Sequence, residues 1–301
     1  MRIPGNIEER SEVLQRDKTF ENLFRLTCDY GERIAARYLS GDEEKSISFV
    51  EYEELSYAYG ARLREIIGLN KKGGFVAIQM DTCPEWFSVF WGCIAAGYNA
   101  ILLDFNLSDA ATDYMLRQAG AVAIISNKRR LLHDDIQQIP AQELFAAKKA
   151  HDFTPSFACQ VALCTSGTTD TSRIYVYDQR AVCEQVLNSV LLYKENKRII
   201  ADEPLRSLAF LPYHHVFGFM VCLLWIHFIG YESIYLKDRS PKTIQETAQR
   251  FHVNHLMAVP ILANNLSNGL QKKVAQQNRY KQIGFKLLRS SSLALQTLAP
   301  S

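Results

Sequence analysis

The sequence predicts an α/β fold in which parallel-rich sheets are flanked by helices. Apolar runs at 75–80, 99–104 and 121–125 alternate with segments of helical periodicity. Strands that alternate with helices of about ten to fifteen residues are typical of parallel βαβ units. The runs are apolar almost without interruption, which indicates strands that are covered on both faces of their sheet.

Further elements are expected on both sides of this core. Pro84 is tolerated in the first turn of a helix that should stop at Gly97, and Asp178 is a suitable N-cap for a helix over 180–193. Residues 127–157 lack periodicity and are expected to form a surface excursion. The remaining expected elements are helices at 19–38, 52–69, 109–119, 216–231 and 241–251, strands at 46–49, 206–211, 231–236 and 255–259, and a last βαβ step ending at 286–289.

Composition narrows the class of protein. Hydrophobic residues make up 48% and charged residues 22% of the 301 residues, which is ordinary for a globular protein. A formal net charge of +2 gives no electrostatic footprint for nucleic acid, and the short basic cluster 128–130 is expected to be a solvated turn. The apolar stretch 216–231 is shorter than the roughly 20 residues that span a bilayer. We therefore expect no membrane span.

Cysteine usage and the N-terminus indicate the compartment. The seven cysteines are odd in number and contain no C-x-x-C pair. The first ten residues lack the apolar core of a signal peptide. Both observations predict a reducing, cytoplasmic setting.

A polar loop between two apolar runs, 161–164 and 174–177, is the main candidate for a binding site. Successive backbone N–H groups and hydroxyls can cradle a polyphosphate, and Arg173 at the exit adds a planar cationic donor fork. Taken alone, the loop is more simply interpreted as a polar hairpin turn between two strands. Its residues are Thr165, Ser166, Gly167, Thr168, Thr169, Asp170, Thr171 and Ser172.

From about residue 19 to the end, the chain resembles the N-terminal domain of the adenylate-forming (AMP-binding) acid ligases. This superfamily contains acyl- and aryl-CoA synthetases, peptide-synthetase adenylation domains and luciferases. Segments 49–55 and 94–104 are similar to early family elements, and Thr165–Thr169 matches the family's phosphate loop. LPYHHVFG at 211–218 looks like the family's LPxxHxxG segment. The order and spacing of all four segments agree with the family.

The resemblance implies two flavodoxin-like subdomains and a two-step reaction. A fatty or aromatic carboxylate is activated with ATP to an acyl-adenylate, and a thiol then displaces AMP. That thiol belongs to CoA as co-substrate or to an acyl carrier protein. Thr165, Ser166, Gly167, Thr168, Thr169 and Arg173 would bind the nucleotide phosphates. His215, rather than His214, matches the family position beside the reacting carboxylate and is the catalytic candidate. The family's Mg²⁺-binding residue falls in a later segment, so no metal ligand is assigned.

Other residues near these motifs have simpler interpretations. Phe217, Phe219 and Met220 can line an acyl tunnel or pack in the core. His252 and His255 are expected to be structural, because no third ligand is placed beside them. Asp104 is expected to shape a turn.

The chain departs from the family in two ways. The family loop continues Gly-x-Pro-Lys, whereas here it reads Asp170-Thr171-Ser172-Arg173, and a carboxylate beside a polyanion opposes ATP binding. Family members also continue past residue 301 into an adenine-binding segment and a C-terminal lid. We therefore expect residues 1–18 to be an N-terminal extension and 19–301 an incomplete N-terminal domain, inactive alone. A noncatalytic nucleotide- or acyl-binding remnant is the alternative.

Overall fold

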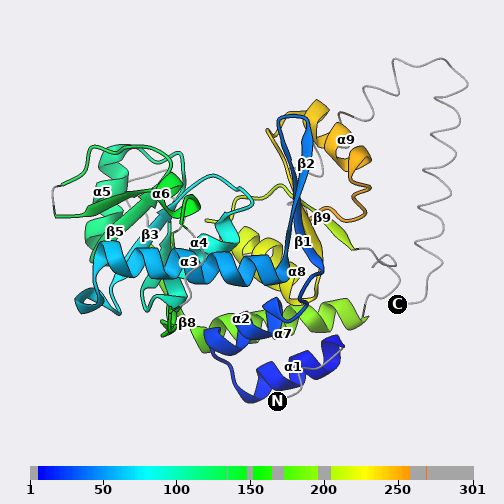
Figure 1. The fold of residues 1–301 in the computed structure, drawn as a ribbon, viewed down its shortest axis with the longest axis horizontal. Coiled ribbons are helices and arrows are strands. Elements are labelled where there is room, and N and C mark those ends of the chain that lie inside the picture. Colours follow the sequence, from blue (N-terminus) through cyan, green and yellow to red (C-terminus); the bar gives the residue numbers. More distant parts are fainter. Residues whose placement is uncertain are drawn as a thin grey trace, which may run out of the picture. The chain divides into compact units, whose positions relative to one another are not determined.

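The computed structural model describes residues 6–133, 135–147, 152–164, 173–195, 205–257 and 269. All of these except residue 269 belong to one compact unit, Met1–Met257 (Figure 1). The polar loop 165–172, the end of the expected strand 255–259 and the last expected βαβ step lie outside the described residues.

A six-stranded sheet carries the expected parallel core. Its strand order is β6-β5-β3-β4-β7-β8. Neighbouring strands are parallel except for β7 and β8, which are antiparallel. The strands are β3 (Phe75–Gln79), β4 (Asn99–Leu102), β5 (Ala121–Ser126), β6 (Gln137–Pro140), β7 (Gln160–Cys164) and β8 (Ile174–Asp178).

A second, four-stranded sheet has the order β2-β1-β10-β9. Strand β10 is parallel to both β1 and β9, whereas β1 and β2 form an antiparallel pair. Its strands are β1 (Ile34–Ser40), β2 (Glu43–Ser48), β9 (Arg206–Ala209) and β10 (Glu232–Tyr235). The two sheets confirm the predicted α/β class with parallel-rich sheets.

Helices flank both sheets, and α4 is buried along its whole length. Helices α3 and α4 pack against each other, and α1, α2 and α7 lie side by side (Figure 1). The helical segments are α1 (Ile7–Arg16), α2 (Phe20–Cys28), α3 (Phe49–Ile67), the 3₁₀ turn η1 (Leu69–Lys71), α4 (Trp86–Ala95), α5 (Asp109–Ala119), α6 (Ala141–Phe145), α7 (Gln179–Glu195), the π-helix η2 (Gly218–Trp225), α8 (Ile226–Phe228) and α9 (Pro241–Arg250).

The expected helix over 19–38 is wrong in its second half. Helix α2 ends at Cys28, and Gly31 adopts a left-handed φ of 61° that a helix does not accommodate. The chain from Ile34 to Ser40 then forms β1, where it pairs with β2 and β10. Cross-strand pairing on both sides has overridden the local helical periodicity.

Two other expectations also need correction. Residues 127–157 are not only a surface excursion, since they contain β6 and α6. Arg130 is buried rather than solvated, and its guanidinium donates to the carbonyls of Phe105 and Leu107 and pairs with Asp109.

Several boundaries follow from local capping. Helix α3 begins at Phe49, earlier than expected, because Ser48 and Glu51 form a capping box. Asp178 caps α7 as predicted, and its Oδ1 accepts the Ala181 N–H at 2.8 Å. Within the expected helix 216–231, η2 and α8 are largely buried and the helix ends at Phe228, and among the described residues no helix is long and apolar enough to cross a membrane.

Candidate functional site at the carboxyl edge of the six-stranded sheet

The carboxyl ends of β3, β4 and β7 meet at one edge of the six-stranded sheet, because these strands are parallel. Leu102 of β4 pairs with Leu163 of β7, so the chain leaves both strands at neighbouring points. The polar loop 165–172 starts from this edge. The predicted binding residues Thr165, Ser166, Gly167, Thr168 and Thr169 lie in it, outside the described residues.

The strands on either side of that loop form an antiparallel pair. Cys164 and Ile174 are direct partners in this pair, and Arg173 is exposed where the chain re-enters it. The connection therefore has the position of a hairpin loop. This position is compatible with both interpretations of the sequence, since a wide hairpin loop at a sheet edge can also hold phosphates.

The loop after β4 is fixed around Asp104. Its Oδ1 accepts the Asn106 N–H at 2.8 Å, and its backbone carbonyl accepts bonds from Leu107 N–H at 3.2 Å and Gln79 Nε2 at 3.0 Å. Asp104 therefore shapes a turn, as expected. Its second carboxylate oxygen faces the histidine segment.

The LPYHHVFG segment follows β9 and folds back tightly on itself. The His215 N–H donates to the Pro212 carbonyl at 3.3 Å, and the His215 carbonyl accepts the Phe219 N–H at 2.8 Å. A Cβ on Gly218 would lie only 2.0 Å from the Pro212 oxygen. This close backbone approach explains why the segment needs glycine at that position.

The two histidines of this segment differ in their surroundings. His214 Nε2 lies 3.6 Å from Asp104 Oδ2, and the His214 side chain is 10% exposed. The rings of His214 and His215 have centroids 4.2 Å apart. Burial lowers the pKa of His214 to about 4, despite the opposing effect of Asp104. His214 is therefore neutral at pH 7.

Further contacts join the same edge to the chain that follows β9 and β10. Asp81, just after β3, pairs with Arg239 at 2.7 Å. Thr82 Oγ1 donates to the Leu211 carbonyl at 3.5 Å. These contacts, together with Asp104 and His214, form what we call the seam between the six-stranded sheet and the histidine segment.

Apolar side chains beside His215 fall into two groups. Phe219 and Met220 are buried, and the Phe219 ring packs on Phe90 at 5.0 Å, so these two belong to the core. Val216 and Phe217 are 52% and 40% exposed. Of the proposed tunnel residues, Phe217 alone remains accessible next to the histidine segment.

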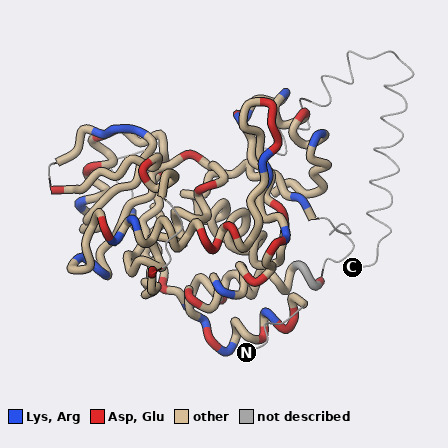
Figure 2. The backbone as a smooth tube through the Cα atoms, viewed as in Figure 1, with Lys and Arg blue, Asp and Glu red and all other residues tan. Residues whose placement is uncertain are grey.

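Charged side chains of both signs are interspersed along the chain (Figure 2). Within the described ranges, no group of three or more His, Cys, Asp or Glu residues can hold a metal ion. His252 has a positive φ of 52° and is exposed, and His255 forms a single parallel bridge with Ser207. Neither residue contributes to the seam.

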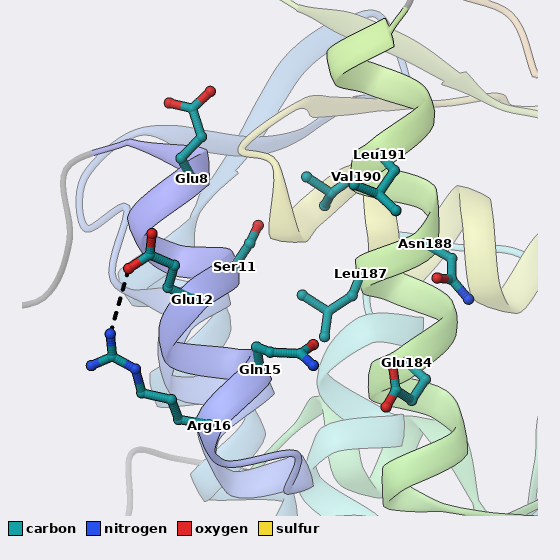
Figure 3. Close-up of a pocket in the computed structure, with 10 residues that line it drawn as sticks. All are labelled: Glu8, Ser11, Glu12, Gln15, Arg16, Glu184, Leu187, Asn188, Val190 and Leu191. Carbon is teal, nitrogen blue, oxygen red and sulfur yellow. Dashed lines mark ion pairs between the residues drawn. The ribbon is translucent and has the colours of Figure 1, made fainter.

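A separate cavity of about 560 Å³ lies between α1 and α7. Figure 3 shows Glu8, Glu12 and Gln15 on one wall and Leu187 and Leu191 on the other. Arg16 lies 3.5 Å from Glu12, and Lys18 pairs with Glu184. Two of the three carboxylates that line the cavity, Glu12 and Glu184, thus have a cationic partner within the chain.

The sequence reasoning missed the link between Asp104 and His214. It ranked His215 ahead of His214 and treated Asp104 only as a turn residue. Both residues lie within segments that resemble family motifs, but nothing in one sequence indicates that their side chains face each other.

Comparisons with known proteins identify the family. The family model described as "AMP-binding enzyme" matches residues 25–296, whereas no curated protein sequence matches. Among solved structures, o-succinylbenzoate CoA synthetase (MenE) from Bacillus subtilis, in complex with the acyl-adenylate intermediate OSB-AMP, is 20% identical with a TM-score of 0.65. The alignment covers 82% of this chain and 64% of that one.

A second similar structure is the N-terminal subdomain of NpsA from Klebsiella oxytoca. It is 16% identical with a TM-score of 0.64, and the alignment covers 79% of this chain and 60% of NpsA. At these identities the likeness shows the fold, which is that of the N-terminal domain of adenylate-forming enzymes. The chain spans less than two thirds of the length of either structure. Because the family model covers most of its residues, the chain belongs to the AMP-binding enzyme family.

Proposed function

We propose that this chain is the N-terminal part of a cytoplasmic, ATP-dependent, AMP-forming acid–thiol ligase. One observation carries the proposal: the histidine segment meets the carboxyl edge of the six-stranded sheet at the exit of β4, beside the start of the polar loop. For adenylation, the phosphate-binding loop must lie close to the residue that contacts the substrate carboxylate. The strand that leads into the polar loop and the histidine segment both reach this edge of the sheet, which supports the proposal.

The reaction proceeds in two steps. A carboxylate oxygen of the substrate attacks the α-phosphorus of ATP, and the bond to the β-phosphate oxygen breaks to release pyrophosphate. A thiol then attacks the carbonyl carbon of the acyl-adenylate and AMP leaves. Such chemistry depends on positioning and on stabilising charge rather than on covalent participation by the protein.

The residue types of the polar loop are suited to binding the phosphates of ATP. Hydroxyl and amide donors of Thr165–Thr169 and the guanidinium of Arg173 are the donor types that bind phosphate oxygens. His215 orients and polarises the reacting carboxylate. Mg²⁺ bound with ATP would neutralise phosphate charge, and we assign no protein ligand to it. Complexes of MenE with ATP and magnesium ion, and with OSB-AMP, support this assignment by analogy.

The acyl substrate is a fatty or aromatic acid. The exposed apolar side chains of Val216 and Phe217, which follow His215 directly, are suited to contact such a group. The thiol is that of CoA, as in the CoA synthetase MenE, with an acyl carrier protein as the other acceptor.

Nucleotide binding is the first test. Calorimetry of the 301-residue chain with ATP and Mg²⁺ should detect binding that Thr168→Val weakens by roughly tenfold or more, since a hydrogen bond to a charged group contributes about 1.5–3 kcal/mol. Thr171→Val is the matched control, because Thr171 has the same side chain but lies outside the segment Thr165–Thr169 that matches the family's phosphate loop. Equal effects of the two variants would refute the assignment of Thr168.

Pyrophosphate exchange separates the ligase from a noncatalytic nucleotide- or acyl-binding remnant. The sequence observation that favours the remnant is Asp170, because the family loop has glycine at this position and a carboxylate beside a polyanion opposes ATP binding. The protein purified from its native source should exchange label between pyrophosphate and ATP when given a suitable carboxylic acid. Binding without exchange over a panel of acids would favour the remnant. Asp170→Gly should tighten ATP binding if its carboxylate faces the phosphates.

A further inference from the structure

His214 lies between two polar neighbours that the motif does not connect. Asp104 Oδ2 is 3.6 Å from its Nε2, and the ring of His215 is 4.2 Å from its own ring, centroid to centroid. We propose that His214 is a positioning residue, which Asp104 holds in place and which in turn fixes the ring of His215. The role of His215 itself rests on the proposed function.

Asp104 is a rigid anchor for this arrangement. One of its carboxylate oxygens already accepts the Asn106 N–H, and its backbone carbonyl accepts bonds from Gln79 and Leu107. Its other carboxylate oxygen faces His214. An ionised carboxylate can only accept hydrogen bonds, so it favours the His214 tautomer that carries its proton on Nε2. The Nδ1 atom of His214 is then an acceptor.

One ring nitrogen of His214 lacks a hydrogen-bond partner among the described residues. Its side chain is nine-tenths buried, and its Nε2 makes no hydrogen bond with any described group. At 3.6 Å, Asp104 is near but beyond hydrogen-bond distance. A buried donor without a partner is costly, and polar contacts in ligand-free sites often tighten when the ligand binds. A small movement of the histidine segment would close this contact.

His215 has little freedom apart from its side-chain torsions. Its backbone is bonded to Pro212 and Phe219, and Gly218 packs against Pro212 at a distance that no other residue permits. The His214 ring, inclined at 52° to the His215 ring, therefore restricts the remaining rotation. In a reaction that depends on positioning, a displacement of about 1 Å can cost a hundredfold in rate.

The titratable and charged groups around His214 are Asp104, His215, Arg239 and Asp81. Burial outweighs the attraction of the two carboxylates and keeps the imidazole neutral at pH 7. A hydrogen bond from His214 to Asp104 would therefore have a neutral imidazole as its donor. It needs no proton uptake to form.

The first test uses the ring nitrogens of the histidines in the free 301-residue protein. Nitrogen-15 NMR should show His214 with its proton on Nε2, and Asp104→Asn should shift His214 towards a mixture of tautomers and change the His215 signals. Asp81→Asn is the matched control, because it removes the ion pair with Arg239 at the same seam and leaves Asp104 in place. A proton on Nδ1 of His214 in the unmodified protein, or an unchanged spectrum for Asp104→Asn, would overturn the proposal.

The second test measures affinity for octanoyl- and benzoyl-sulfamoyladenosine, which mimic an acyl-adenylate. Asp104→Asn and His214→Phe should weaken binding about tenfold, whereas Asp81→Asn should retain it. His214→Phe keeps a ring beside His215 but removes both ring nitrogens, so a loss of affinity that matches the loss in Asp104→Asn is the result that supports the link to Asp104.

The two tests separate the possible failures. If the unmodified protein binds neither analogue, the proposed function is wrong for these acyl classes, and the NMR measurement still decides whether His214 positions His215. If binding is tight and Asp104→Asn leaves it unchanged, the positioning role is refuted while the proposed function stands.

Discussion

Two histidines at opposite ends of one helical stretch both have a lowered pKa, but they lie in different surroundings and have different roles. His214 precedes the helix at the seam, and His227 lies in its last turns, in α8. Burial lowers the pKa of both to about 4. His227 is fully buried, its Nδ1 donates to the Leu223 carbonyl at 2.6 Å, and it contacts the rings of Phe49, Tyr52 and Phe87.

The neighbours decide what each histidine can do. His227 is surrounded by aromatic rings, so it is a core residue whose neutral state is part of the packing. His214 meets a carboxylate, a second imidazole and, nearby, the ion pair of Asp81 with Arg239. A perturbed pKa therefore identifies a functional histidine only when polar groups converge on it.

The largest expected effect comes from the turn that separates the two regions. Gly218→Ala would place a methyl group 2.0 Å from the Pro212 oxygen, and we expect a loss of about 3 kcal/mol in the free energy of unfolding. Chemical denaturation measures it. Gly120→Asn is the control, because this left-handed helix cap has open space around it and asparagine tolerates that conformation. Equal losses in both variants would show that the close approach at Gly218 is not the cause.

Acid should destabilise the folded protein, because the buried His227 binds protons more readily in the unfolded state. A histidine with a lowered pKa in the folded state binds protons preferentially in the unfolded state, so stability is complete above the unfolded pKa of about 6.5 and falls as the pH drops towards 4. For His227 the loss between pH 7 and pH 5 should be about 2 kcal/mol. His214 adds to it in the same direction.

His227→Phe checks this attribution. Denaturation at the two pH values should show that the variant loses less stability on acidification than the unmodified protein, by about 2 kcal/mol. An unchanged pH dependence would mean that His227 is already protonated or accessible in the folded state.

The smallest effect concerns the charges at the seam. Arg239 lowers the pKa of His214, so Arg239→Gln should raise the pKa of His214 and leave that of His227 unchanged in an NMR titration. The ion pair with Asp81 is partly exposed, and its loss should cost less than about 1 kcal/mol. A shift at His227 would contradict the separation of the two regions.

The sequence predicted most of the parallel core because those strands and helices carry strong local signals. The bounds of α5 were correct, and the buried strands β3, β4 and β5 were recognised from continuous apolar runs. Strand β1 was missed because Ile34–Ser40 continues a helical apolar pattern by chance, and only pairing with β10 makes it a strand. Such long-range pairing cannot be inferred from local periodicity.

The candidate site shows the same limit. The motif around His215 could be recognised from residue types and spacing, but the facing of Asp104 and His214 arises from two segments far apart in the chain. The phosphate-binding role of Thr165–Thr169 stays a prediction. Its position at the exit of β7, next to that of β4, follows from strand register rather than from the loop's own residues.

One measurement tests the account most directly. The ring signals of His214, His215 and His227 can be followed by NMR while the chain is titrated with octanoyl- or benzoyl-sulfamoyladenosine. We predict saturable shifts at His214 and His215 with His227 unchanged. Saturable binding that shifts His227 and leaves His214 and His215 unchanged would contradict the location of the adenylate site at the carboxyl edge.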